Sequence, residues 1–315
     1  MNNLTIGKRS FAEYNLVSHY AKELSANTVY LMHFNAIQLA LVFKRPQFKI
    51  KGILFNQFFR MNPKNWKEKL KYYRKYLITK LYCTNSAVES VFILNDTKSV
   101  SQFNEKFVTN IFKAIPDPIP ELKPLVGFVL RKKYNLGSDK KIFLHFGSLA
   151  ARKGTLETIE ATTMITKEKQ AQMVLLLVGN PENVETEQKI LNSIDKAKKS
   201  SYVNIIWEKK FVSNSLMKSL FLQCTSVVMP YKNPEASSGI LGHALAAKKA
   251  VITTGKGLLR ELVENNNFGI LLDNVTPEEI AKAMSKIENS KADNKAYSDY
   301  LKEHTPTKFS KTLLK

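Results

Sequence analysis

Cysteine is nearly absent from this chain of 315 residues, which contains only Cys83 and Cys224. Two cysteines cannot build a disulfide framework, and they do not have metal-ligand spacing, so the sequence fits a reducing cytoplasm. No run approaches the roughly 20 apolar residues of a membrane span. The first ten residues carry no apolar stretch behind Lys8 and Arg9, so no secretory signal is expected. These absences predict a soluble, cytoplasmic protein.

Acidic residues are also scarce, because 27 Asp and Glu stand against 48 Lys and Arg, which gives a formal charge of +21. Residues 1–120 are the more basic part, with 18 basic and 7 acidic side chains. Such a field attracts phosphates on nucleic acid, lipid or a small substrate without choosing among them. The hydrophobic content of 44% is sufficient for two domains, each with its own core.

Helical and strand patterns alternate in the first 120 residues. Helices are expected at 11–24, 36–43, 65–80 and 86–94, and strands at 28–33, 50–55 and 81–84. This alternation is typical of a parallel sheet covered by helices. The chain starts with a helix, without the strand and turn that usually open such a sheet, so the first domain is expected to be incomplete. Clustered prolines at 115–124 indicate a linker.

The expected helix at 65–80 has an apolar stripe and an excess of one charge. The stripe consists of Trp66, Leu70, Tyr73 and Leu77. The basic residues around it are Lys64, Lys67, Lys69, Lys71, Arg74, Lys75 and Lys80, against a lone Glu68. Two interpretations stay open: the helix lies on an anionic membrane surface, or the stripe faces the core and the charged side is solvated.

The second half predicts a doubly wound domain. Strands are expected at 141–146, 173–178, 203–207, 226–229 and 250–253, with helices between them. Ligands of such domains bind beyond the carboxyl ends of the strands. The glycine-containing loops at 147–154 and 179–181 lie at that end.

The stretch 230–245 is a strand, loop and helix in succession, and it predicts an anion site. Backbone N–H groups near Ser238, Gly239 and Ile240 would have no partner within the helix and would suit a phosphate. Arg152 and Lys153 follow another strand at the same end, and the two loops together favour a diphosphate. Alternatively, Ser238 or its neighbour Ser237 is only the N-cap of an ordinary helix.

These motifs resemble the retaining GT-B-fold glycosyltransferases of family four, also called glycosyl transferases group one. The resemblance rests on Phe146-Gly-Ser-Leu-Ala-Ala-Arg-Lys-Gly154, on Val178-Gly-Asn180, on Pro230-Tyr231 with Glu235 and Ser238-Gly-Ile240, and on the segments at 250–254 and 269–272. It covers the second half well and the first half loosely. It implies an α/β fold of two Rossmann-like domains facing a cleft, with a nucleotide sugar held by the second domain and the acceptor by the first.

The resemblance also implies roles for particular residues. Catalytic roles fall on Lys153 and Arg152, which would stabilise the leaving diphosphate, and on Glu235, which would contact the transferred sugar. The donor-binding residues would be Gly147, Ser148, Gly179, Asn180, Ser238, Gly239, Ile240 and His243. Ser148 replaces an arginine of the family pattern, and His243 replaces the second glutamate, whose carboxylate can accept two hydrogen bonds from a ribose where an imidazole cannot. No metal site or cofactor is expected.

The resulting hypothesis divides the chain into three segments and assigns it one main function. Residues 1–120 would form the acceptor-side domain, 121–290 the nucleotide-sugar domain, and 291–315 a helical segment packing back on the first domain. His33 would contact sugar or acceptor, or would be a structural histidine. The expected function is retaining, metal-independent hexosyl transfer from a nucleotide diphosphate sugar to a glycan or lipid-linked acceptor in cell-surface polysaccharide synthesis.

Partners and alternatives follow from the same residues. The basic helix at 64–80 would contact an anionic membrane and give a cytoplasmic protein on the inner face of that membrane. The main alternative is a non-catalytic nucleotide-sugar-binding protein. Specific nucleic-acid binding is not expected, because the net positive charge is the only feature of the sequence that supports it.

Overall fold

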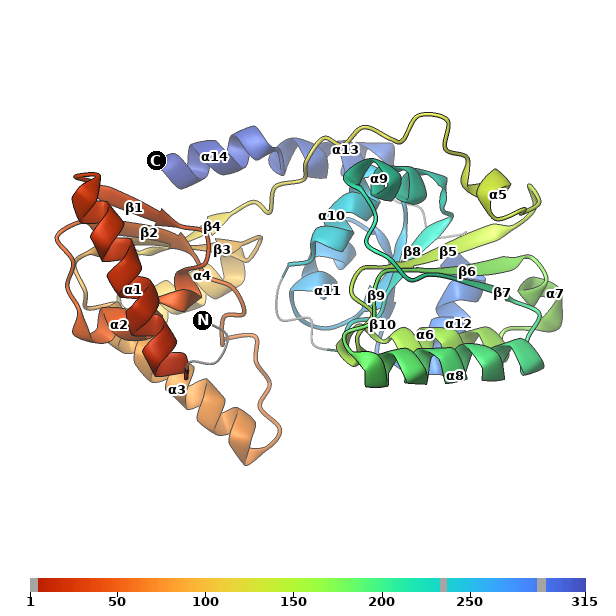
Figure 1. Ribbon diagram of the computed structural model, residues 1–315, viewed down its shortest axis with the longest axis horizontal. Coiled ribbons are helices and arrows are strands. Elements are labelled where there is room, and N and C mark those ends of the chain that lie inside the picture. The colour runs from red at the N-terminus through yellow and green to blue at the C-terminus, as the bar shows by residue number, and fades with distance from the viewer. Residues whose placement is uncertain (1–4, 233–236, 288–292) are drawn as a thin grey trace. The chain divides into compact units, whose positions relative to one another are not determined.

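The computed structural model describes residues 5–232, 237–287 and 293–315, which divide into two compact units. Unit 1 holds residues 5–117, Ser237 and residues 307–315, and unit 2 holds the other described residues between 118 and 306. Each unit contains a parallel sheet with helices packed on its faces (Figure 1). The predicted α/β class is therefore confirmed.

Unit 1 has a four-stranded sheet in the order β1-β2-β3-β4, and all strand pairs are parallel. Its elements are α1 (Ile6–Glu23), β1 (Thr28–Leu31), the 3₁₀ helix η1 (Phe34–Ala36), α2 (Gln38–Phe43), β2 (Lys49–Ile53), α3 (Trp66–Tyr82), β3 (Val88–Leu94), α4 (Thr97–Phe107), β4 (Phe112–Ile115) and α14 (Pro306–Leu314). Phe34, Phe58 and Phe103 lie in a core beneath α1 to α4, whereas Leu313 of α14 belongs to a separate cluster with Phe92 of β3.

Two elements predicted for unit 1 are wrong, namely the strand at 81–84 and the helix at 86–94. The helix α3 continues to Tyr82, which is fully buried, and residues 88–94 form β3 inside the sheet. The apolar residues of β3 fall three and four apart, as in a helix, because both faces of an internal parallel strand are buried and need not alternate with polar residues. The elements α4 and β4 were not anticipated.

The apolar stripe of α3 faces solvent, so the interpretation that it packs into the core is wrong. Its members are exposed: Trp66 69%, Leu70 61%, Tyr73 65%, Leu77 54%, and Leu81 at 41% extends the row. The core contacts of α3 come from a different set of side chains. Tyr72 and Tyr76 pack against Phe58 with ring centroids 5.1 and 6.0 Å apart, respectively.

Unit 2 has a six-stranded parallel sheet in the order β10-β9-β8-β5-β6-β7. Its elements are α5 (Leu130–Lys133), β5 (Lys141–Phe146), η2 (Ala151–Lys153), α6 (Thr155–Ala161), η3 (Thr162–Met164), α7 (Lys167–Gln170), β6 (Met173–Val178), α8 (Val184–Ser200), β7 (Asn204–Glu208), α9 (Asn214–Gln223), β8 (Ser226–Met229), α10 (Gly239–Ala246), β9 (Val251–Thr254), α11 (Gly257–Glu264), β10 (Gly269–Leu272), α12 (Pro277–Lys286) and α13 (Asn294–Glu303). The strand order reverses between β5 and β8, and the helices that follow these strands, α6 and α10, pack into different core clusters. Doubly wound sheets bind ligands at such a point.

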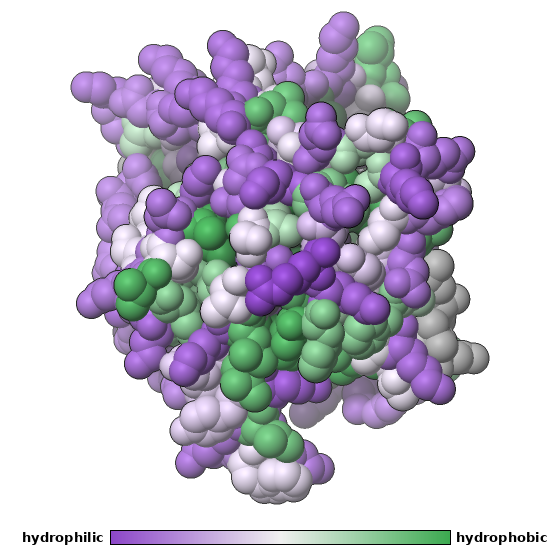
Figure 2. Space-filling model, turned by 90° about the vertical axis from the view of Figure 1, so that its left-hand side faces the viewer, coloured by the Kyte–Doolittle hydropathy of each residue, from purple (hydrophilic) through white to green (hydrophobic). Residues whose placement is uncertain are grey.

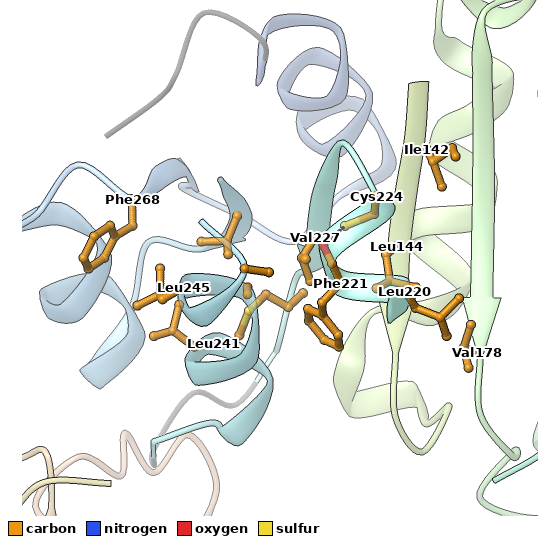
Figure 3. Close-up of a cluster of buried hydrophobic side chains, with 14 of the residues drawn as sticks. Ile142, Leu144, Val178, Leu220, Phe221, Cys224, Val227, Leu241, Leu245 and Phe268 are labelled. Atoms are coloured by element: carbon orange, nitrogen blue, oxygen red, sulfur yellow. Dashed lines mark hydrogen bonds between the residues drawn. The ribbon is translucent and has the colours of Figure 1, made fainter. Parts of the chain in front are cut away.

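The core of unit 2 fixes the position of α10. Leu241 and Leu245 of α10 belong to one buried cluster with Phe221 of α9 and with strand residues such as Leu144 and Val227 (Figure 3). Each side chain of this size stabilises the fold by about 1.5–3 kcal/mol when fully buried. The start of α10 is therefore held firmly at the end of the sheet. The sequence predicted five strands here, and β10 is the sixth.

Candidate functional site

The first part of the site is the turn that follows β5. The chain turns at Gly147, whose φ of +110° lies in the region that favours glycine. A Cβ atom at this position would lie 2.7 Å from Nζ of Lys153. The absence of a side chain at Gly147 therefore makes room for the ammonium group of Lys153. A second left-handed glycine, Gly154 at φ +69°, then starts α6.

Lys153 is a buried cation without an ionic partner among the described residues. Only 8% of its surface is exposed, and its Nζ lies 5.4 Å from the ring centroid of Tyr231. No described acidic side chain forms an ion pair with it. Burial, and secondly the charge of Arg152, lower the pKa of Lys153 from 10.5 to about 8. A buried unpaired charge is unfavourable, so this environment favours the approach of an anion.

The buried side chain of His145 bonds to the elements on either side of this loop. Its Nδ1 lies 2.8 Å from the carbonyl oxygen of Val228, which can only accept, so the neutral ring carries its proton there. Its Nε2 then accepts from the hydroxyl of Thr155, 3.0 Å away at the start of α6. Burial is the main reason that the pKa of His145 falls to about 4. The ring is thus neutral at physiological pH and connects β5, β8 and α6.

The second loop, after β6, packs directly on the first. Gly179 has φ +138°, and a Cβ there would lie 1.9 Å from the carbonyl oxygen of Gly147. The amide of Leu149 donates to the carbonyl of Asn180 at 2.8 Å. The indole of Trp207 donates to the carbonyl of Gly179 at 3.1 Å. Gly179 therefore has no room for a side chain where the two loops meet.

The third loop joins β8 to α10. The amide of Lys232 donates to the carbonyl of Arg152 at 2.9 Å, which connects this loop to the first. Ser238 occupies the N-cap position, but its hydroxyl makes no capping hydrogen bond and instead lies 3.3 Å from the hydroxyl of Tyr231. A Cβ on Gly239 would meet no described atom within 4 Å, whereas Ile240 reaches to 3.9 Å from the Cβ position of Gly147. The start of α10 is thus open and lies beside the Gly147 turn.

The structure brings most of the predicted donor-binding residues together at the carboxyl ends of β5, β6 and β8. Gly147, Lys153, Gly179, Ser238 and Ile240 are connected by the contacts above. On the same loops, the side chains of Ser148, Arg152 and Asn180 are exposed, as is Gly239 at the start of α10. Their assigned roles stay predictions, because these contacts show proximity and not ligand binding.

Three predicted residues are not joined to this group by the contacts described above. His243 is part of α10, and its ring centroid lies 5.8 Å from that of Phe221. His33 belongs to unit 1, where it follows β1, is exposed, and lies 5.8 Å from the ring of Phe55. Glu235 lies outside the described residues.

Sequence reasoning missed the side chains that shape the site without carrying its charge. Tyr231 lies beside Lys153, and His145 and Thr155 position the loop between them. The Pro-Tyr pair at 230–231 was visible in the sequence, but its contact with Lys153 depends on tertiary packing. A histidine within an otherwise apolar strand was the available signal for His145.

Neither a metal cluster nor a membrane-crossing helix is found in the part of the chain that the structure describes. No group of three or more His, Cys, Asp or Glu side chains is arranged there to hold a metal ion. None of the described helices is long and apolar enough to span a bilayer.

These features define a class of protein. The reversed strand order, the two touching glycine turns, the buried lysine and the open start of α10 are typical of Rossmann-like units that bind anions beyond the ends of their strands. Together with a second parallel-sheet unit, this is the architecture of GT-B glycosyltransferases. The family model described as "Glycosyl transferases group 1" matches residues 128–304. This match covers more than half of the chain, which therefore belongs to that family.

Individual relatives agree with the family. The chain is 27% identical over 176 residues to a lipopolysaccharide 1,2-N-acetylglucosaminetransferase of Salmonella typhimurium, which covers 54% of this chain and 42% of that enzyme. It is 23% identical over 298 residues to an uncharacterized glycosyltransferase of Methanocaldococcus jannaschii, covering 88% of this chain and 69% of the relative. A solved structure from Anabaena, HepE in complex with UDP, has a TM-score of 0.71 at 17% identity and covers 95% of this chain and 80% of that chain.

Proposed function

We propose that this protein is a glycosyltransferase that moves a sugar from a nucleotide diphosphate sugar to an acceptor hydroxyl. The observation that carries the proposal is Lys153, a buried cation with no described acidic partner, held between the Gly147 turn and Tyr231. A diphosphate would supply the missing negative charge. The Anabaena neighbour with UDP bound supports a uridine nucleotide as the first donor to test.

In the proposed reaction the bond between the anomeric carbon and the diphosphate oxygen breaks, and the acceptor oxygen bonds to the same face of that carbon. The acceptor proton passes to the departing diphosphate. Lys153, Arg152 and the first N–H groups of α10 would stabilise the charge that develops on the leaving group. Glu235 would contact the transferred sugar, and no metal ion is needed in this scheme. Retention and hexosyl transfer are therefore parts of the proposal.

We extend the proposal to acceptor and location. A glycan or lipid-linked acceptor in cell-surface polysaccharide synthesis is consistent with the lipopolysaccharide enzyme among the relatives. Unit 1, with His33, would hold this acceptor. A cytoplasmic enzyme working beside the inner face of a membrane would meet both nucleotide sugars and lipid-linked glycans.

A panel of nucleotide sugars tests the donor assignment. We expect one donor to raise the melting temperature of the protein and to release its nucleoside diphosphate when an acceptor extract is added. Lys153→Ala should lower transfer by about 100-fold or more, in the range for loss of one group that stabilises a developing oxyanion. The matched control is Lys198→Ala, at an exposed lysine of α8. Equal transfer by Lys153→Ala and the control would contradict the proposal.

A second candidate is a non-catalytic nucleotide-sugar-binding protein. The observation that favours it is His243, which stands where the family pattern has a ribose-binding glutamate. Melting shifts with a donor but no release of nucleoside diphosphate, with any acceptor fraction, would favour this candidate.

A further inference from the structure

The exposed face of α3 is an unpartnered apolar surface. The surface, which we call the α3 stripe, consists of Trp66, Leu70, Tyr73, Leu77 and Leu81, each more than 40% exposed. These positions are four, three, four and four residues apart and therefore lie in one row along the helix. Figure 2 views the side of the molecule that carries α1 to α3, where hydrophobic side chains gather between hydrophilic ones.

The opposite face of α3 already holds the helix to the core of unit 1. The side chains on that face are Tyr72, Tyr76, Thr79 and Tyr82. Tyr82 packs edge-on against Phe34 at 5.3 Å, and Tyr76 lies 5.3 Å from Phe107. Because this second face satisfies the packing of the helix, the α3 stripe is not needed to fold unit 1.

The charges beside the α3 stripe are positive except for one. Exposed basic side chains flank it at Lys64, Lys67, Lys69, Lys71, Arg74 and Lys80. Glu68 is the only acidic residue between positions 64 and 80, and its carboxylate accepts a hydrogen bond from the amide of Lys64 at 2.7 Å. The surroundings of the stripe therefore present a strong positive potential to any partner.

We propose that the α3 stripe docks on the surface of an anionic lipid bilayer. Leucine side chains would enter the outer part of the acyl region, and Trp66 and Tyr73 would lie at the level of the headgroups, where amphipathic rings are favoured. The flanking lysines would extend their alkyl chains along the apolar surface and place their charges among lipid phosphates. The helix lies in the membrane plane and keeps its other face in the core.

Charge complementarity selects lipid over a second copy of this chain. A symmetric dimer through the α3 stripe would place the same lysine rows opposite each other, and like charges facing each other oppose association. An anionic bilayer supplies both an apolar layer and negative charge. This proposal goes beyond glycosyl transfer, because binding to a bilayer requires neither donor nor acceptor.

Sedimentation with lipid vesicles tests the proposal. The intact protein should bind vesicles of phosphatidylcholine mixed with phosphatidylglycerol, and bind phosphatidylcholine alone much more weakly. The double variant Leu70→Gln with Leu77→Gln should lower the partition coefficient by about tenfold or more, because two apolar side chains no longer enter the bilayer. The control replaces Leu191 and Leu222, two leucines of unit 2 that are each 40% exposed, by Gln, and should bind as the intact protein does.

Two further measurements separate apolar insertion from simple charge attraction. Lys67→Gln with Lys69→Gln should weaken binding roughly fivefold per lysine, and added salt should weaken the intact protein in the same way. Trp66 fluorescence should shift to the blue and be quenched by brominated lipid, and Trp66→Phe should remove this response, leaving only Trp207 of unit 2. Donor-induced melting shifts of all variants should match those of the intact protein.

Three outcomes would overturn the proposal. The first is equal vesicle binding by the leucine double variant and its control. The second is a loss of binding in the lysine variant alone, without a Trp66 response, which would mean attraction without insertion. The third is a concentration-dependent dimer that the leucine double variant abolishes while vesicles bind no protein, which would assign the surface to a second copy.

Discussion

A buried charge of unit 1, Asp96, and a buried charge of unit 2, Lys153, have different surroundings. In unit 1, Asp96 is buried and receives two bonds from Arg60, at 2.6 and 2.7 Å, as well as bonds from Gln57 and the amide of Ser99. Burial opposes its charge, but the hydrogen bonds from Arg60 and Ser99 hold the pKa of this carboxyl below its usual range. In unit 2, Lys153 has no described acidic partner. A buried charge that has its partner within the fold has no need of a ligand, whereas a buried charge without a partner is available to one.

The two units also differ in the residues that follow their strands. In unit 2, β5 and β6 are followed directly by Gly147 and Gly179, and their backbones touch. In unit 1, the corresponding left-handed positions after β2 and β3 are Asn56 and Asn95, with φ of 50° and 58°. The side-chain amide of Asn95 bonds within unit 1: it donates to the hydroxyl of Ser237 at 3.0 Å and accepts from the amide of Asp117 at 2.8 Å. The glycine turns of unit 2 carry no side chain that could make such bonds.

The largest expected effect comes from breaking the satisfied pair of unit 1. Asp96→Ala leaves Arg60 buried without its carboxylate and removes the N-cap of α4. Loss of one partner of a buried ion pair typically costs about 3–5 kcal/mol of unfolding free energy. Urea unfolding of the variant and of the intact protein measures this difference in unfolding free energy. A loss below about 1 kcal/mol, within the range of an exposed pair, would contradict the distinction between the two charges.

Gly179→Ala should have the next largest effect. Its Cβ would overlap the carbonyl oxygen of Gly147, and φ of +138° is strained for alanine. We expect a loss of about 3 kcal/mol in unfolding free energy, together with loss of donor-induced melting shifts. Gly127→Ala is the control, because Gly127 also has a positive φ of 72° but a Cβ there meets no described atom within 4 Å. A similar loss in both variants would show that the contact of the two loops is unimportant.

Lys153→Met should act in the opposite direction on stability. The charged form is unfavourable in the folded protein, since the folded pKa of about 8 lies below the unfolded value of 10.5. This penalty is fully present below pH 8, decreases as pH rises from about 8 to 10.5, and is absent above that range. The variant should therefore be more stable than the intact protein at pH 7 by about 1 kcal/mol or more, and the difference should shrink at pH 10.

The same pKa predicts the pH dependence of donor binding. A diphosphate favours the protonated lysine, so affinity should fall as pH rises through about 8, by up to about tenfold per pH unit. Titration calorimetry at pH 7 and pH 9 measures this. In Lys153→Met the residual binding should not change over this range, and a slope that persists in the variant would assign the titration to another group.

The smallest expected effect concerns His243. His243→Glu introduces the carboxylate of the family pattern, which can accept two hydrogen bonds from a ribose diol. We expect tighter donor binding by about fivefold, equivalent to about 1 kcal/mol for a gained hydrogen bond. His243→Gln, which keeps the side chain polar but uncharged, is the control. Equal donor affinities of the two variants would show that the side chain at position 243 does not contact the ribose.

The sequence was most informative where strands are buried on both faces and are followed by glycine or proline. The limits of β5, β6 and β8 were predicted to the residue, because each is a short apolar run bounded by turn residues. Prediction failed at β3, whose apolar spacing also fits a helix. At the α3 stripe the sequence left two interpretations open, because two faces of one helix are apolar. Which face packs inward depends on neighbours such as Phe58, which lie elsewhere in the chain.

The sequence also predicted some features of the candidate site and missed others. The basic and glycine residues of the loops after β5, β6 and β8 were predicted, because strand ends converge in a parallel sheet. The burial of Lys153, its contact with Tyr231 and the support from His145 were not, because all three depend on how loops fold over one another. Residue type therefore predicted which loops lie together at the strand ends, and packing determined which of their cations is buried.

The position of α14 has a consequence for how the chain folds during synthesis. Residues 307–315 belong to unit 1, where Leu313 is buried with residues of β2, β3 and β4. Unit 2 is thus an insertion within unit 1 along the chain. On the ribosome, unit 2 can complete its core first, whereas unit 1 must wait with one sheet face uncovered until α14 emerges from the exit tunnel. Removal of α14 should therefore expose the sheet of unit 1 to chaperones and proteases while leaving unit 2 intact.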